Sequence, residues 1–249
     1  MGKLKTIKTV MMKRYMLHFI FRILVFIATF VTYLINKELL VDLAMQNITM
    51  GITPLHVLWV VFMGTMMLHL FPNKKLTMAL RKIEEPSFRP VENPNPAALL
   101  EFIKNQNAKA WIVMLVWVVF NGCFGVLYLL NIIGVADLLM LTVFFYLCDY
   151  ICILIYCPFQ HLIMKNRCCV NCRIYDWGHF MMFTPMVFIR NFFSWSLFFT
   201  AVVVLLNWEL TYAKHPERFY YGVNQSLQCA NCKDKICTVK KKIVKVDSI

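Results

Sequence analysis

The sequence predicts an all-α integral membrane protein, a polytopic bundle of about five transmembrane helices with no separate soluble domain. Apolar residues make up 60% of the 249-residue chain, charged residues only 16%, and Phe alone occurs 21 times. Several apolar runs reach the roughly 20 residues that an α-helix needs to cross a bilayer. We expect spans at about 16–35, 55–71, 111–133, 138–164 and 180–210, so that residues 1–210 form the bundle and 211–249 a polar tail rich in Cys and Lys.

The first two spans each begin after a recognisable signal. The run 16–35 follows a basic stretch, as in a signal peptide, but its length and its lack of a small-residue cleavage pattern predict a retained anchor. The run 55–71 is short and opens after Thr53-Pro54, a pair that favours a helix start. The Pro-rich connection that follows predicts a loop and then a short amphipathic helix over 97–107.

The later spans are set by their links. Gly134-Val135-Ala136-Asp137 is so short that spans three and four must form an antiparallel hairpin. The fifth run, 180–210, is long enough to cross once and too short to cross twice. We therefore expect one crossing. The alternative is that the run folds back at Arg190-Asn191.

The basic charge is interpreted as topology. The formal net charge is +13, but the 26 Lys and Arg cluster between the apolar runs, as the positive-inside rule predicts, and do not indicate a nucleic-acid partner. This pattern places the N-terminus in the cytoplasm. We expect a protein of the plasma (inner) membrane whose partners are the lipid bilayer and other membrane subunits.

Two cysteine pairs share one local pattern, Cys169-Val-Asn-Cys172-Arg and Cys229-Ala-Asn-Cys232-Lys. Thiols two residues apart bind one soft metal ion or form one redox couple, and two such pairs make the four-sulfur set of zinc or an iron-sulfur cluster. The sequence therefore predicts a soft-metal centre on these four residues. Further ligands for it are Cys157, Cys168 and Cys237.

The fifth run decides whether that centre forms. If it crosses the membrane, Cys169 and Cys172 lie on the opposite side from Cys229 and Cys232, whereas a fold-back puts both pairs on one side. Four functions stay open: an electron-transfer subunit, a metal-handling protein, a thiol–disulfide redox protein, and a scaffold whose cysteines only link loops. No hydrolase motif occurs in the sequence, and the enzyme question stays open.

Two further predictions concern buried polar groups. His56 and His69 lie in one apolar run, but no second run carries a matching pair, which argues against heme. Asp149 is the one acid clearly deep in a span, and Arg190 lies inside the fifth run. Because a lone charge at such depth costs several kcal/mol, we expect Asp149 and Arg190 to form a buried ion pair.

Overall fold

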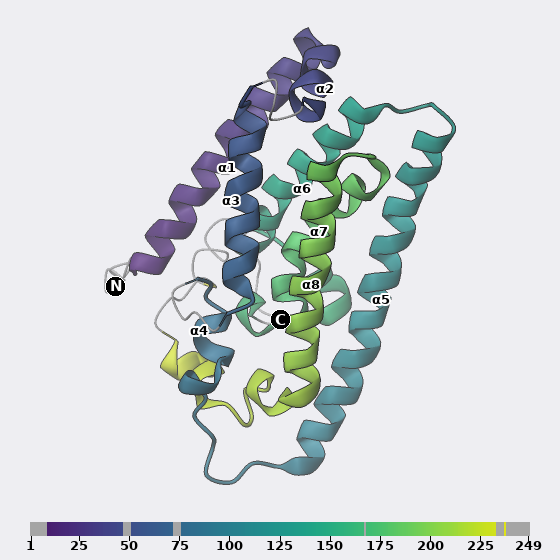
Figure 1. Cartoon of the computed structure of the whole chain (residues 1–249). Helices are drawn as coiled ribbons and strands as arrows, with labels where there is room; N and C mark the ends of the chain where they lie inside the picture. The colour runs from purple at the N-terminus through teal and green to yellow at the C-terminus, as the bar shows by residue number, and fades with distance from the viewer. Residues whose placement is uncertain (1–8, 47–50, 72–75, 167, 233–236, 238–249) are drawn as a thin grey trace, which may run out of the picture.

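The computed structural model describes residues 9–46, 51–71, 76–166, 168–232 and 237, and within these ranges the protein is helical, without β-strands. Four helices of the described chain are long and apolar enough to cross a membrane: α1 (Val10–Ile35), α5 (Pro96–Leu129), α6 (Val135–Leu154) and α8 (Phe192–Lys214). A shorter apolar helix, α3 (Pro54–His69), stands among them (Figure 1). The predicted class of helical membrane protein is thereby supported.

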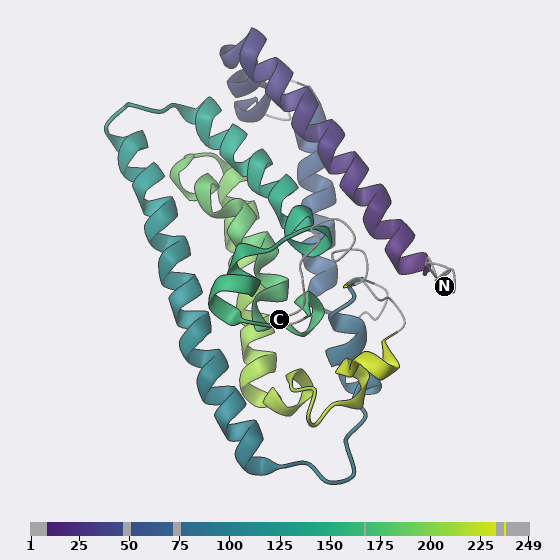
Figure 2. The same cartoon turned by 180° about the vertical axis from the view of Figure 1, so that it is seen from behind.

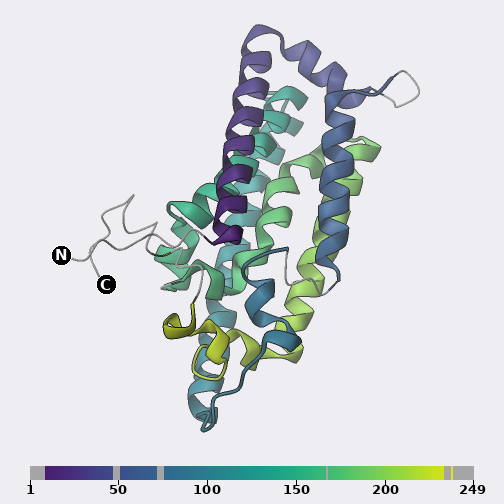
Figure 3. The same cartoon turned by 90° about the vertical axis from the view of Figure 1, so that its left-hand side faces the viewer.

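The long helices form one bundle in which α1 packs along α6 and α3 packs along α8. The short helix α2 (Lys37–Met45) joins α1 to α3 at one end, next to the link between α5 and α6. We call this the hairpin end. Figure 2 shows α1 and α5 on opposite sides of the bundle, and Figure 3 shows α2 between α1 and α3 at one end of it. The loops that carry the cysteine pairs lie at the other end, called here the cysteine end.

Several helix limits agree with the sequence signals. Thr53 caps α3 and Pro54 is its first residue, and the His56 side chain completes the cap by binding the Thr53 amide. The hairpin of α5 and α6 turns at Gly134, as predicted. Helix α5, in contrast, is one uninterrupted helix of 34 residues. The expected separate helix at 97–107 is part of it, because no Pro or Gly follows Pro96 before Gly122.

Helix α6 ends ten residues earlier than the expected span 138–164, at Leu154. Pro158 follows soon after, and its lack of a backbone N–H prevents a continuous helix. The chain instead makes a π-helical turn, η3 (Phe159–Met164), which ends at Lys165 in the left-handed region with φ of 51°. This turn packs against α5 and leaves the second half of α6 beside a cavity.

The expectation of a single crossing by 180–210 is wrong. The run contains α7 (Gly178–Phe183), the 3-10 turn η6 (Thr184–Phe188), a break, and then α8, which packs back on both. The rings of Phe180 and Phe198 lie 6.3 Å apart, and Trp195 donates to the Val187 carbonyl at 3.2 Å. Pro185 ends α7, and the break at 189–191 is the fold-back that the alternative interpretation described.

The fold-back is held in place from two sides. A side chain at Gly125 of α5 would collide with the Phe188 ring, so α5 approaches η6 closely there. The Asn191 side chain donates to the Ala44 carbonyl of α2 at 3.1 Å. Because of this reversal, the Cys169-x-x-Cys172 and Cys229-x-x-Cys232 segments both lie at the cysteine end.

The described part of the predicted tail packs on the bundle. Phe219 is buried between the rings of Trp208 and Tyr212, and the Asn224 side-chain amide donates to the Lys82 carbonyl at 3.1 Å. These contacts join the segment after α8 to helix α4 (Leu80–Ile83). Residues 233–236 and 238–249 of the predicted tail lie outside the described residues.

The fold-back gives a direct topological prediction. A reporter fused at the C-terminus and one fused after Lys82 are expected to lie on the same side of the membrane, and one fused after Asp137 on the other. The basic loops predict that the first side is the cytoplasm. Paired phosphatase and fluorescent-protein fusions at each position test this. A C-terminal reporter on the side of Asp137 would contradict the fold-back.

Candidate functional site

The two cysteine pairs of the sequence adopt the same turn. Each begins a single 3-10 turn, η4 (Cys169–Asn171) and η9 (Cys229–Asn231), with extended backbone on both sides. In each, the amide of the second cysteine donates to the carbonyl of the first, at 3.0 Å in η4 and 3.3 Å in η9. The Asn171 side-chain amide donates to the Leu227 carbonyl at 3.1 Å. The repeated pattern is therefore a repeated turn, and the two segments are neighbours.

A buried lysine lies between these segments. Lys82 of α4 is only 7% exposed, and its ammonium donates to the Cys232 sulfur at 3.4 Å. Its charge also acts on Cys168, immediately before η4. A hydrogen bond from the Cys169 thiol, the Val170 amide and the Lys82 charge together outweigh burial and lower the pKa of Cys168 to about 6. These contacts therefore favour the thiolate form of Cys168.

Five of the ten cysteines line one cavity. Its volume is about 450 Å³, and it lies between α5, the second half of α6 and the segment 157–182. The Cys152 and Cys157 thiols are hydrogen-bonded to each other, and the Cys169 sulfur lies 3.8 Å from the Ile153 carbonyl oxygen. Aromatic rings form much of the remaining wall. We call this space the sulfur-lined cavity; its cysteines are Cys148, Cys152, Cys157, Cys169 and Cys172.

The predicted metal ligands are thus divided between two surroundings. Cys169 and Cys172 are buried and line the cavity, Cys229 is exposed, and Cys232 contacts Lys82. Among the described residues, no three His, Cys, Asp or Glu side chains are grouped as metal ligands. Cys237 is described, but the residues on both sides of it are not.

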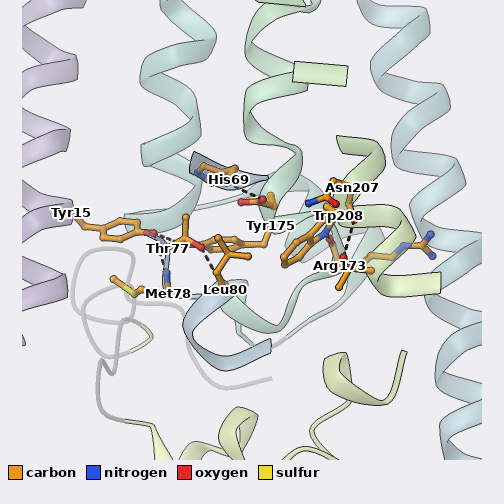
Figure 4. A network of polar contacts seen from close by, with 11 residues as sticks. Tyr15, His69, Thr77, Met78, Leu80, Arg173, Tyr175, Asn207 and Trp208 are labelled. Carbon is orange, nitrogen blue, oxygen red and sulfur yellow. Dashed lines mark hydrogen bonds and ion pairs between the residues drawn. The ribbon is translucent and has the colours of Figure 1, made fainter. Parts of the chain in front are cut away.

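The segment directly after the first turn, η5 (Arg173–Trp177), connects most of the bundle (Figure 4). The Tyr175 hydroxyl is hydrogen-bonded to that of Tyr15 on α1 at 2.8 Å, and Tyr15 in turn accepts from the Met78 amide at 3.4 Å. The Arg173 carbonyl accepts from Trp208 of α8 at 2.6 Å. These contacts fix the cysteine turn relative to both α1 and α8.

Asp176 of η5 forms a second buried contact. Its carboxylate lies 3.1 Å from Nδ1 of His69, the last residue of α3, and the His179 ring packs edge-on to His69 at 4.7 Å between centroids. Burial opposes ionisation of Asp176, but the charge and hydrogen bond of His69 lower its pKa overall. A separate cavity of about 350 Å³ reaches this pair from the side of Glu84.

The predicted ion pair of Asp149 and Arg190 does not form. Asp149 pairs with Arg22 of α1, with 2.7 Å between Oδ2 and a guanidinium nitrogen, and the same guanidinium stacks on Tyr146 and Tyr150. Arg190 is exposed at the fold-back. Arg190 lies at the break between η6 and α8. This break is at the hairpin end of the bundle, away from Asp149.

Sequence reasoning missed Arg22, Lys82 and the contacts of η5. Arg22 had a usable signal, because a charge inside an apolar run requires a partner and Asp149 was the one clear deep acid. Lys82 had none, since a lysine in a basic loop is normally solvated. Asp176 and His69 are far apart in sequence and meet only through the fold.

Comparisons with known proteins return no relative. No protein-family model matches the chain, and neither a curated protein nor a solved structure is significantly similar to it. The function is therefore argued from the site alone.

Proposed function

We propose that this protein is a thiol–disulfide oxidoreductase of the plasma membrane, with Cys168 as the attacking thiolate at the cysteine end of the bundle. The observation that carries the proposal is the buried Lys82 ammonium, which donates to Cys232 and stabilises negative charge on Cys168. A buried ammonium requires a compensating anion, and a thiolate supplies it. A neutral cysteine that served only for packing would not need a buried ammonium beside it.

The exchange proceeds without a bound cofactor. The Cys168 thiolate attacks one sulfur of a partner's disulfide, a new S–S bond forms, and the other partner sulfur leaves as a thiolate and takes up a proton. Cys232, at the same ammonium, then attacks the mixed disulfide and releases the partner's second thiol. Cys169 is a poor resolving thiol, because adjacent Cα atoms lie ~3.8 Å apart and unstrained disulfides need ~4.4–6.8 Å.

A second candidate keeps the soft-metal centre. The two cysteine turns have the same backbone conformation and are neighbours, which favours a shared site on Cys169, Cys172, Cys229 and Cys232. Zinc or an iron-sulfur cluster suits four thiolates. In that case the metal would require Cys229 to leave the surface and Cys169 to leave the cavity wall.

Alkylation of Cys168 tests the first proposal. At pH 7, a thiol with a pKa of about 6 is ~90% thiolate, whereas an ordinary one with a pKa of ~8.5 is a few per cent thiolate. Cys168 should thus react with iodoacetamide nearly as fast at pH 7 as at pH 8, as followed by peptide mass spectrometry. Lys82→Met is expected to raise the pKa by about one unit and to slow the reaction about fivefold at pH 6.

The matched control is Lys37→Met at the hairpin end, which should leave the rate unchanged. Slow alkylation of wild-type Cys168 at pH 7 would contradict the thiolate. The same preparation should also be analysed for zinc and iron. Stoichiometric metal would favour the metal centre over the oxidoreductase if its release is what makes Cys168, Cys169 and Cys172 reactive toward iodoacetamide.

A further inference from the structure

The sulfur-lined cavity holds thiols that the exchange at Cys168 does not use. Cys152 of α6 and Cys157 of the following turn are hydrogen-bonded to each other and both face the cavity. Pro158 directly follows Cys157, in the turn that brings the two thiols together. Two thiols in contact are one step from a disulfide, so this pair is suited to giving up two electrons and two protons together.

The residues that line the cavity limit which compound could bind there and accept these electrons and protons. Apart from the thiols and Asp149, which is paired with Arg22, the lining is mainly aromatic and apolar and includes Trp117, Phe145 and Met181. A polar oxidant such as a peptide disulfide would lose its hydration there with few polar groups to replace it. A volume of about 450 Å³ falls within the usual ~300–1,000 Å³ of small-molecule sites. The cavity also lies among apolar helices, where a lipid-soluble compound partitions.

The geometry points to a quinone as the occupant, reduced by the Cys152–Cys157 pair. As the Sγ–Sγ bond forms, the two thiols lose two protons and two electrons, and both carbonyls of the quinone become the hydroxyls of a quinol. No other reactant is needed. This inference rests on the proposed thiol–disulfide function, because in the reverse direction of that exchange a partner's dithiol reduces a Cys168–Cys232 disulfide, and the quinone is the final acceptor of those two electrons.

Cys169 lies between the Lys82 site and the Cys152–Cys157 pair. Its thiol is hydrogen-bonded to Cys168 on one side, and on the other its sulfur lies 3.8 Å from the carbonyl oxygen of Ile153, the residue next to Cys152. Cys172 lines the same cavity from the other end of the turn. After a partner's dithiol has reduced the Lys82 site, disulfide exchange through Cys172 would pass those electrons to an oxidised Cys152–Cys157 pair and restore its two thiols.

Binding is tested first, without turnover. Decylubiquinone, whose ring is fully substituted and cannot be alkylated by thiols, should quench the fluorescence of Trp117 in the whole protein in nanodiscs, with the Trp117→Phe variant as background. Cys148→Phe fills the cavity and is expected to raise the half-quenching concentration about tenfold. The same change at exposed Cys123, which does not line the cavity, should have no effect. Equal quenching in the Cys148→Phe and Cys123→Phe variants would mean that decylubiquinone only partitions into the lipid, and would overturn the proposed binding site.

Reduction is tested next, without oxygen. The reduced protein should convert one decylubiquinone to quinol and acquire one Cys152–Cys157 disulfide, identified by peptide mass spectrometry. Cys152→Ser and Cys157→Ser should each abolish reduction while retaining quenching and the alkylation of Cys168. Normal alkylation of Cys168 without quinone reduction by the wild type would overturn this inference and leave the oxidoreductase proposal standing. Failure of the Cys168 alkylation would instead contradict the proposed function.

Discussion

Asp149→Asn and Arg22→Met are each expected to destabilise the bundle strongly, by about 3 to 5 kcal/mol, because each leaves one charge without its partner among apolar helices. The two groups lie 2.7 Å apart with side chains 23% and 12% exposed. The guanidinium also covers the rings of Tyr146 and Tyr150, so Arg22→Met should cost somewhat more. Thermal unfolding in detergent measures both losses.

The double variant of Arg22 and Asp149 separates pairing from packing. Removing both charges removes the uncompensated one, so the double variant is expected to be more stable than either single variant. Arg190→Gln is the matched control and should leave the stability nearly unchanged, since Arg190 is exposed. Additive losses in the double variant, or a loss in Arg190→Gln as large as in Arg22→Met, would show that Asp149 has a different partner.

Local signals predicted the parts of the fold that short segments determine. Thr53-Pro54 started a helix because the threonine side chain caps it and proline suits its first turn. Gly134 marked a hairpin because its link is too short for any other connection. In both places the interaction that decides the structure lies within a few residues of chain.

The fold-back could not be predicted in the same way. The run 180–210 is apolar throughout, and apolarity measures the preference for lipid without stating a direction. Its reversal depends on Phe188 packing against Gly125 and on Asn191 reaching Ala44, both contacts between distant segments. Pro185 and Arg190 were the local signs of a break, and the ion pair assigned to Arg190 followed from treating the run as one helix.

The candidate site shows the same difference between features set by the local sequence and features set by tertiary contacts. The repeated Cys-x-Asn-Cys pattern predicted a shared metal centre, and what the structure shows of it is two like turns, because the backbone conformation of four residues is largely local. Which thiols meet is decided by tertiary contacts. Cys152 and Cys157 approach because α6 ends early, and Cys232 reaches Lys82 because the chain after α8 packs on α4.

Glu209→Gln is expected to have the second large effect, on both stability and thiol reactivity. Glu209 of α8 accepts from the guanidinium of Arg173, with Nε at 3.1 Å from Oε2, and from the Trp177 indole at 2.8 Å. The ion pair is largely buried, with side chains 13% and 23% exposed. The same guanidinium donates to Asn107 of α5, so the pair joins α5, η5 and α8.

Loss of the Glu209 charge should therefore lower stability by about 3 kcal/mol, since the buried guanidinium is left unpaired. Because η5 directly follows Cys172, the cysteine turn should loosen as well, and Cys169 and Cys172 should become faster to alkylate. Peptide mass spectrometry after timed iodoacetamide treatment measures this, with Lys37→Met as the control for an exposed pair. Glu209→Gln with unchanged alkylation of both thiols would mean that Asp176 and Tyr175 hold the turn without Arg173.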